Sequence, residues 1–229
     1  EDVRTVPLAV SVLGGEALED QHIVDLSDLS RAIPNLSFSG GQGGGGSGLS
    51  NIQLRGISSQ AGSATVGVYM DDVSMTTRNL YSVGSAEPKF FDIDRIEVLR
   101  GPQGTLYGAS SMGGTIKFVT NQPNANQTET NVNGELSSTQ HGGINRLVNA
   151  VFNAPLVPGE LGFRLGVQSG HTSGSIDQVA QTDGHVIAKG INSSDDLVMR
   201  LAAKWTPNAK LSVTPSLFYQ QVKSDGMDV

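Results

Sequence analysis

The second half of the chain alternates between apolar and polar positions. The alternation is clearest from position 161, where apolar Leu161, Phe163, Leu165 and Val167 interleave with Gly162, Arg164, Gly166 and Gln168. A period of two places the apolar side chains on one face of a β-strand and the polar ones on the other. The same pattern marks 148–154, 197–205 and 211–220, and more weakly 132–136. We therefore expect about five strands that share one apolar face.

The connections between these segments differ in length. Residues 140–143, 155–159 and 207–209 are short, whereas 174–194 is long and polar. In an antiparallel arrangement the connections 155–159 and 207–209 lie at one end of the sheet, and the long connection 174–194 lies at the other. Short turns at one end and longer loops at the other are typical of barrels that cross the bacterial outer membrane. The half-buried strands of a soluble β-sandwich alternate as well, so this alternative stays open.

A barrel would need more strands than these. About five strands cannot close, and an open sheet would leave unpaired edges and an apolar face exposed. We therefore expect further strands beyond Val229. Trp205 falls at the end of its segment that would face the periplasm, where interfacial aromatic side chains gather.

The first half of the chain mixes helix and strand signals. Asp25 is a candidate N-cap, apolar residues follow it at helical spacing, and Pro34 ends the helix. Strands are predicted at 6–13, 52–55, 66–70, 96–100 and 115–120. A small mixed α/β domain is the result. The polar stretch 121–126, which contains Pro123, marks a boundary between two domains, 1–122 and 123–229.

Composition narrows the classes of function. The net charge is −7 and basic residues are scattered along the chain, which argues against nucleic acid as a partner. Cys is absent, which excludes disulfides and thiolate metal sites. No apolar run approaches the roughly 18 residues of a membrane-spanning helix. The chain opens at Glu1 without a signal peptide, as expected of a mature or truncated piece.

The sequence does not indicate an enzyme. Its four histidines lack metal-ligand spacing, and no serine lies in a Gly-x-Ser-x-Gly elbow. The pairs Asp71-Asp72 and Asp92/Asp94 are more simply explained as solvated or strand-end carboxylates than as an acid–base pair. The glycine-rich run 40–48 lacks the Gly-Lys-Ser/Thr of a phosphate loop, so we interpret it as a flexible loop. We expect no catalytic residue, no metal site and no cofactor.

One long motif carries a specific resemblance. Residues 91–116 have the sequence FDIDRIEVLRGPQGTLYGASSMGGTI, which resembles the late plug signature of TonB-dependent receptors. Shorter segments at 6–10, 26–34, 51–57 and 68–73 resemble plug segments of that family in order and spacing. The resemblance covers essentially 3–120, and the strand pattern extends it to 223.

The resemblance implies a fold and a function. The fold would be an α+β plug domain, with a small mixed sheet and short helices, followed by antiparallel strands of an incomplete transmembrane β-barrel. The function would be TonB-dependent uptake of a scarce ligand, such as a ferric siderophore, cobalamin or an oligosaccharide, across the bacterial outer membrane. TonB would pair by strand addition with a segment upstream of Glu1. The other partners would be the small-molecule ligand and outer-membrane lipid. A soluble α/β domain with a β-sandwich, acting in binding or adhesion, is the alternative.

Two arginines are candidates for anchoring the plug. Arg55 and Arg100 each end a predicted strand immediately before Gly. A charge at such a position must be either solvated or paired. The resemblance implies that both arginines pair with barrel glutamates. The alternative is an ordinary surface arginine at a strand end.

Four residues are candidates for contacting the ligand. The resemblance implies that members of this family contact their ligands through loops of the plug. These loops correspond here to residues 40–48, 58–64 and 74–84. The polar and aromatic side chains available there to fix a ligand are Gln60, Arg78, Asn79 and Tyr81. Exposed loop residues without a binding role are an equally simple interpretation.

Overall fold

The chain forms two compact units, Glu1–Asn121 and Gln122–Val229. The computed structural model describes residues 9–40, 49–58, 64–76 and 85–224. Each unit is described by itself below.

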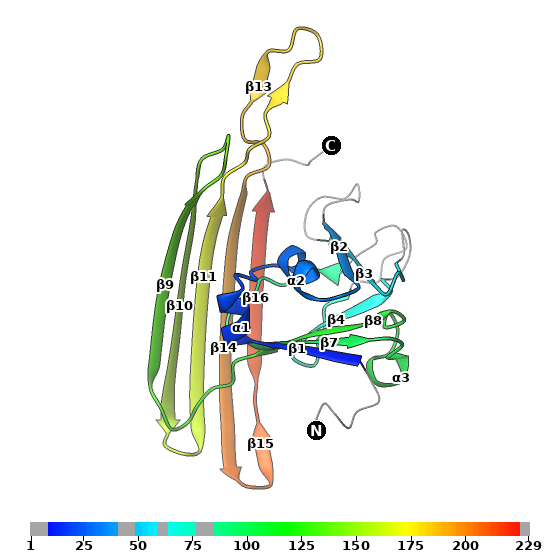
Figure 1. The fold of residues 1–229 in the computed structure, drawn as a ribbon. Coiled ribbons are helices and arrows are strands. Elements are labelled where there is room, and N and C mark those ends of the chain that lie inside the picture. Colours follow the sequence, from blue (N-terminus) through cyan, green and yellow to red (C-terminus); the bar gives the residue numbers. More distant parts are fainter. Residues whose placement is uncertain (1–8, 41–48, 59–63, 77–84, 225–229) are drawn as a thin grey trace. The chain divides into compact units, whose positions relative to one another are not determined.

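Unit 1 is built on a mixed five-stranded sheet in the order β1-β7-β8-β4-β5 (Figure 1). Its strands are β1 (Ala9–Gly14), β4 (Val66–Met70), β5 (Val73–Ser74), β7 (Ile93–Arg100) and β8 (Gly114–Thr120). The β4–β8 pair is parallel, and the other pairs are antiparallel. A second, three-stranded sheet contains β2 (Leu36–Gly40), β3 (Leu49–Leu54) and β6 (Ser85–Ala86). The mixed sheet predicted for this half is confirmed.

Three short helices complete the described part of unit 1: α1 (Gly15–Asp20), α2 (Leu26–Ala32) and α3 (Gly104–Tyr107). The predicted cap of α2 is confirmed, since the Asp25 carboxylate accepts a hydrogen bond of 2.8 Å from the backbone N–H of Asp28. Ile33 is already extended, as the following Pro34 requires. None of the helices in the described ranges could cross a membrane. Both α1 and α3 are missing from the sequence prediction, because a single turn carries too little periodicity to detect.

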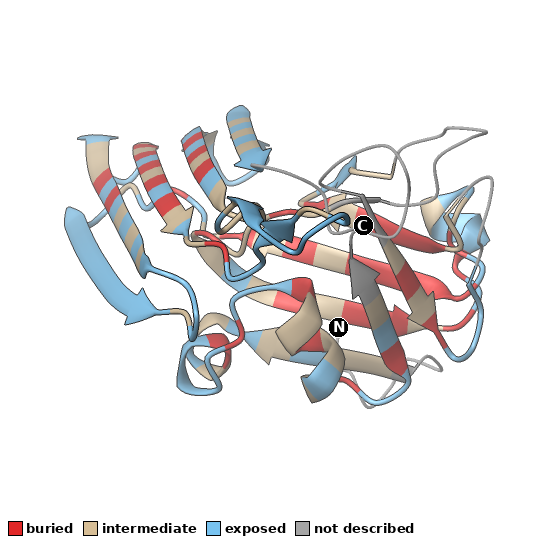
Figure 2. Ribbon diagram, turned by 90° about the horizontal axis from the view of Figure 1, so that it is seen from above, coloured by how far each residue is buried: buried red, intermediate tan, exposed pale blue. Residues whose placement is uncertain are grey.

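The core of unit 1 lies on one face of the central strands. The fully buried apolar side chains there are Val66, Val68, Ile96, Val98, Ile116 and Phe118. They occupy alternate positions along β4, β7 and β8, and the strands of unit 1 carry buried stretches, coloured red in Figure 2. Phe118 also contacts Phe90, with ring centroids 5.1 Å apart. The strands predicted at 66–70, 96–100 and 115–120 therefore carry the core of unit 1.

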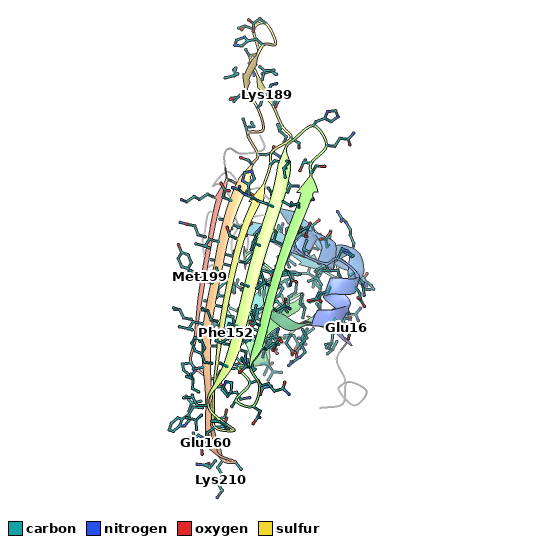
Figure 3. All side chains as sticks on the ribbon, turned by 90° about the vertical axis from the view of Figure 1, so that its left-hand side faces the viewer. Glu16, Phe152, Glu160, Lys189, Met199 and Lys210 are labelled. Carbon is teal, nitrogen blue, oxygen red and sulfur yellow. The ribbon has the colours of Figure 1, made fainter. Side chains whose placement is uncertain are left out.

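Unit 2 is a sheet of long antiparallel strands. Its strands are β9 (Glu129–Ser138), β10 (Ile144–Val157), β11 (Leu161–Thr172), β14 (Ser194–Asn208), β15 (Leu211–Val213) and β16 (Ser216–Ser224). Neighbours along the sheet are β9, β10, β11 and β14, and β14 pairs with both β15 and β16. The connections alternate between the two ends: Glu160 and Lys210 mark one end and Lys189 the other (Figure 3). A small hairpin of β12 (Gln178–Val179) and β13 (Val186–Ala188) lies within the long connection.

Three details of the strand prediction were wrong. The segment 211–220 is not one strand, because it is interrupted at Thr214-Pro215 between β15 and β16. Pro155 and Pro207 lie within β10 and β14 and not in turns. The pairing shifts register between Pro155 and Val157 and between Trp205 and Asn208. Such irregular pairing tolerates a proline, which has no N–H to donate to a ladder.

The glycine at the start of β8 offers a sharp test of this packing. Gly114 has φ +153°, and a Cβ there would overlap the Leu99 carbonyl oxygen and Cδ2 of Leu54. Gly114→Ala should therefore destabilise unit 1 by about 3 kcal/mol or more. Protease susceptibility across a urea titration measures the change. The control is Gly104→Ala, where nothing lies within 4 Å and φ is not positive. Equal stability of the two variants would contradict the prediction.

Candidate functional site

The long motif forms the connection between β7 and β8. Its two sides are joined by backbone hydrogen bonds from Gly101 N to Gly113 O (2.9 Å) and from Gln103 N to Ser111 O (2.8 Å). The α3 turn lies between these bonds, and its Tyr107 carbonyl accepts a hydrogen bond from the Tyr69 hydroxyl of β4. The motif is therefore a compact turn that is closed by its own backbone and fastened to the sheet.

Four buried polar atoms in this turn and in the strand residues beside it lack hydrogen-bond partners among the described residues. They are Nε of Arg100, Nε2 of Gln103, Oγ of Ser111 and Oγ1 of Thr115. Gln103 is 4% exposed, Ser111 1% and Thr115 0%. Buried polar atoms without partners cost free energy, and most folded proteins contain few of them. The turn therefore holds unused hydrogen-bonding capacity inside an otherwise well-packed unit.

The two candidate anchoring arginines approach this same turn from different strands. Nη2 of Arg100 donates a hydrogen bond of 3.1 Å to Oγ of Ser11 on the neighbouring β1. Nη1 of Arg55 lies 3.3 Å from the position that a Cβ on Gly101 would occupy. Arg55 is exposed and has a positive φ of 54°. The structure thus brings Arg55 beside Gly101, the residue that follows Arg100. Neither Arg55 nor Arg100 forms an ion pair within the described ranges.

The four candidate ligand contacts, Gln60, Arg78, Asn79 and Tyr81, lie outside the described residues. The same applies to most of the glycine-rich run, 41–48.

Two adjacent aspartates at the end of β4 have different roles. The Asp71 carboxylate accepts hydrogen bonds from the Thr120 backbone N–H (2.9 Å) and from its hydroxyl (2.9 Å). The Asp71 N–H donates to the Phe118 carbonyl at 2.7 Å. Asp71 therefore fastens the end of β4 to the end of β8. Thr120 is a partner that the sequence did not reveal, because the two residues are far apart in the chain.

Asp72 instead forms an exposed ion pair with Lys117, at 2.8 Å. Burial lowers the pKa of Lys117, but the hydrogen bond and charge of Asp72 raise it more, so the net shift is upward. Lys117 therefore stays protonated. Both agree with the expectation of solvated or strand-end carboxylates: Asp72 is 93% exposed, and Asp71 directly follows the last residue of β4.

Unit 2 exposes its apolar side chains and buries its polar ones. The outward side chains include Val148 (55% exposed), Phe152 (41%), Leu165 (39%), Met199 (44%) and Leu217 (67%), and Figure 3 labels Phe152 and Met199. On the opposite face the buried side chains include Asn153, Arg164, Gln168 and Arg200. Arg164 forms an ion pair of 3.3 Å with Glu129 there. This polarity is the reverse of that in a soluble sheet and is typical of strands whose outer face meets lipid.

A short segment at the start of unit 2 is held against the polar face of the sheet. The Asn153 amide accepts a hydrogen bond from Asn124 N (2.9 Å) and donates to Asn124 O (3.0 Å) and Gln127 O (2.6 Å). Gly162 leaves room for this segment, because a Cβ there would lie 2.8 Å from Ala125 N. Asn153 is fully buried. It is a structural residue that no sequence motif indicated.

No group of three or more histidine, aspartate or glutamate residues that could hold a metal occurs in the part of the chain that the structure describes. Two histidines instead pair with single carboxylates. His171 Nδ1 lies 2.8 Å from Asp195 Oδ1, and His185 Nδ1 lies 2.6 Å from Asp183 Oδ1. The hydrogen bond from His185 lowers the pKa of the exposed Asp183 carboxyl.

The family follows from comparison with known proteins. Residues 2–115 match the family model described as "TonB-dependent Receptor Plug Domain". This chain belongs to the TonB-dependent receptors. The sequence-based recognition is thereby confirmed, and the receptor's unit 1 is the plug of that family.

Curated relatives match the plug half of the receptor chain. The pesticin receptor of Yersinia pestis is 34% identical over 117 residues, which are 50% of this chain and 16% of that protein. The iron-regulated outer membrane virulence protein of Vibrio cholerae is 30% identical over 121 residues, 52% of this chain and 18% of that protein. The matched residues therefore cover less than a fifth of the length of these relatives.

Solved structures match both units of the receptor chain. The ferric yersiniabactin uptake receptor FyuA from Yersinia pestis has a TM-score of 0.75 at 23% identity, over 94% of this chain and 32% of its own. The alcaligin receptor FauA from Bordetella pertussis has a TM-score of 0.70 at 17% identity, over 98% of this chain and 34% of its own. These likenesses confirm the predicted fold, a plug followed by antiparallel barrel strands.

The Asp71 bridge predicts a local effect in the plug. Asp71→Ala removes the acceptor of both Thr120 donors and should destabilise the ends of β4 and β8 by about 2 kcal/mol. Hydrogen–deuterium exchange of the peptide that covers β8 measures the loss of protection. The matched control is Asp72→Ala, whose carboxylate is exposed and should change the exchange little. Faster exchange in the control than in Asp71→Ala would refute the assignment.

The Asn153 clamp predicts an effect in unit 2. Asn153→Ala leaves three backbone groups of the segment 124–127 without their partner and should cost about 2–4 kcal/mol. Fluorescence of Trp205, the single tryptophan of the chain, reports on unit 2 during urea unfolding. Asn149→Ala, on the same face of β10 and without a side-chain hydrogen bond in the described ranges, is the control. The clamp is disproved if both variants unfold at the same urea concentration.

Proposed function

We propose that the receptor to which this chain belongs imports a ferric siderophore across the bacterial outer membrane with energy supplied through TonB. The observation that carries this proposal is the combination, in one chain, of a TonB-dependent plug and antiparallel strands with an exposed apolar face. Several similar proteins are named for such ligands, among them the ferric yersiniabactin receptor, the ferripyoverdine receptor and the catecholate siderophore receptor Fiu. Cobalamin or an oligosaccharide is less well supported as the transported ligand.

The apolar face of unit 2 has the height that membrane embedding requires. On β14 the outward positions between Asp195 and Trp205 are Leu197, Met199, Leu201 and Ala203. Ten residues at about 3.3 Å each span roughly 33 Å along the strand. A strand tilt of about 40° reduces this to roughly 25 Å, the height of the apolar band in outer-membrane barrels. This agreement supports the assignment of these strands to the membrane.

The plug offers a route for mechanical energy. β1 is an edge strand of its sheet and pairs only with β7 among the described strands, over Ala9 to Gly14. Force applied to the chain before β1 would act first on this pairing and on the Arg100–Ser11 hydrogen bond. The turn that follows β7 contains two buried polar atoms without partners among the described residues, Nε2 of Gln103 and Oγ of Ser111. A rearrangement of this turn would break the backbone hydrogen bonds that close it, and it would let the unpartnered side-chain atoms form new ones.

The proposal assigns roles to the candidate residues. Arg55 and Arg100 are assigned to ion pairs with barrel glutamates that hold the plug in place. The exposed guanidinium of Arg55 and the unpartnered Nε of Arg100 leave donors for such pairs. Gln60, Arg78, Asn79 and Tyr81 are assigned to ligand contact, since they supply the polar and aromatic groups that fix an oxygen-rich chelate.

Uptake of radioactive iron tests the function. The full-length receptor is expressed in a bacterium that lacks its own siderophore receptors, and cells are supplied with ferric yersiniabactin, ferripyoverdine or a ferric catecholate. At least one complex should enter when TonB is present and none when the tonB gene is deleted. Uptake that continues without TonB, or a full-length product that is not in the outer membrane, would disprove the proposal.

A disulfide lock tests the coupling route. The chain contains no Cys, and Val12 faces Glu97 across β1 and β7, so Val12→Cys/Glu97→Cys creates one defined bond. Oxidation should abolish uptake while ligand binding persists, and a reductant should restore uptake. The control pair is Val148→Cys/Ser169→Cys, which joins β10 to β11 and should not block uptake. Full uptake by the oxidised β1–β7 lock would exclude movement of β1.

A further inference from the structure

The long connection between β11 and β14, residues 173–193, forms a two-stranded ribbon. Figure 1 shows its hairpin of β12 and β13 projecting beyond the ends of the long strands. Near the base of the ribbon, Ile191 N donates a hydrogen bond of 2.9 Å to Ile176 O. Near its tip, Ala180 N donates one of 2.8 Å to His185 O. A two-stranded ribbon by itself is only marginally stable in water, so its position depends on what holds its base.

The side chain of Asn145 joins the base of the ribbon to the neighbouring turn between β9 and β10. Its Oδ1 accepts hydrogen bonds from the backbone N–H (2.8 Å) and the hydroxyl (3.0 Å) of Ser173. Its Nδ2 donates to Oγ1 of Thr139 (3.0 Å), at the start of the turn. The Ser173 hydroxyl also accepts a hydrogen bond of 2.9 Å from the Gly143 N–H. Asn145 and Ser173 therefore fasten the two connections at this end of the sheet into one block.

A second asparagine, Asn192, crosses the base of the ribbon itself. Its Oδ1 accepts hydrogen bonds from the backbone N–H groups of Ser175 (2.8 Å) and Ile176 (2.9 Å) on the opposite side. Next to these bonds, the Asp177 carboxylate accepts a hydrogen bond of 3.1 Å from the Gly190 N–H. The two sides of the base are therefore tied together by side chains as well as by backbone groups.

Three glycines at the base are packed directly against backbone. A Cβ on Gly142, in the β9–β10 turn, would lie 2.7 Å from the carbonyl oxygen of Gly174. A Cβ on Gly174 would in turn overlap the carbonyl group of Gly190, on the other side of the ribbon. Glycine allows this close approach because it has no Cβ. These glycines therefore serve dense packing at the base, and the turn and both sides of the ribbon meet there.

A loop that closes over a ligand needs a few residues at its base that change φ and ψ. Here those positions are 173–176 and 190–192, which the two asparagines and the packed glycines hold. We propose that Asn145 and Asn192 make the connection 173–193 a fixed post at the outer end of the barrel strands, which keeps its position when the receptor binds a ferric complex. The outward orientation and the ligand rest on the proposed function. Any closure over the ligand must then come from other loops of the receptor.

The distance between two spin labels in the full-length receptor tests the post. The chain contains no Cys, and Ser138 on β9 and Gln181 at the ribbon tip are exposed, so Ser138→Cys/Gln181→Cys gives one defined pair once any Cys elsewhere in the receptor is replaced by Ser. In phosphatidylcholine vesicles, double electron–electron resonance should give one narrow distance distribution. Ferric yersiniabactin, ferripyoverdine and a ferric catecholate should each leave it unchanged, including the complex that the receptor binds. A mean distance that shifts on binding, or a broad distribution without ligand, would overturn the proposal.

Substitution of the two asparagines identifies what holds the post. Asn145→Ala and Asn192→Ala should each widen the distance distribution about twofold, because the base of the ribbon then opens locally. Asn192→Asp keeps the oxygen that accepts both hydrogen bonds and should retain the narrow distribution. Asn149→Ala, on the same face of β10 as Asn145 and without a side-chain hydrogen bond in the described ranges, is the control. The proposal is refuted if both asparagine-to-alanine variants at the base keep the wild-type width.

Iron uptake separates this inference from the proposed function. All variants should retain the heat-modifiable gel migration of the wild type, which shows that the barrel is folded. TonB-dependent uptake together with a label distance that shifts on binding would refute the post and leave the import proposal standing. Failure to import any of the three ferric complexes, with a narrow distribution that Asn145→Ala and Asn192→Ala widen, would refute import and leave the fixed base standing.

Discussion

The hydrogen bonding of the backbone constrains unit 2 more than any other factor. In lipid no water replaces a missing partner, so each strand must satisfy its N–H and C=O groups on its neighbours. The registers meet this demand over ten consecutive pairs between β10 and β11 and twelve between β11 and β14, with a shift after Pro155 near a turn. Because side chains then alternate strictly, apolar residues such as Leu165 and Met199 can all face outward while Arg164 and Arg200 face the other way.

The plug is organised differently from unit 2, around a small apolar core. Its core is a small layer of alternating apolar side chains on three central strands, and β1 is an edge strand of this sheet. Asp71 and Gly114 fix the ends of β4 and β8 tightly, whereas the turn between β7 and β8 retains buried polar atoms without partners. The backbone of this turn is hydrogen-bonded, so its unused capacity is confined to side chains.

Much of this architecture could be predicted from the sequence, because alternation and helix caps are local signals. The strands β4 and β8, the Asp25 cap and the two faces of β11 and β14 followed directly from neighbouring residues. The positions of Pro155 and Pro207 inside strands could not be predicted from neighbouring residues, because a register shift depends on the partner strand. Short elements such as α1 and β2 escaped because a few residues hold no detectable period.

The sequence by itself determined the family, through one long motif, and the outward face of the barrel strands, through a period of two. Only the tertiary structure decided which distant residues meet. Three such contacts join residues far apart in the chain: Arg55 beside Gly101, Asp71 on Thr120 and Asn153 on Asn124. Their contacts depend on strand order and register, which arise from pairing between strands and leave no trace in the local sequence.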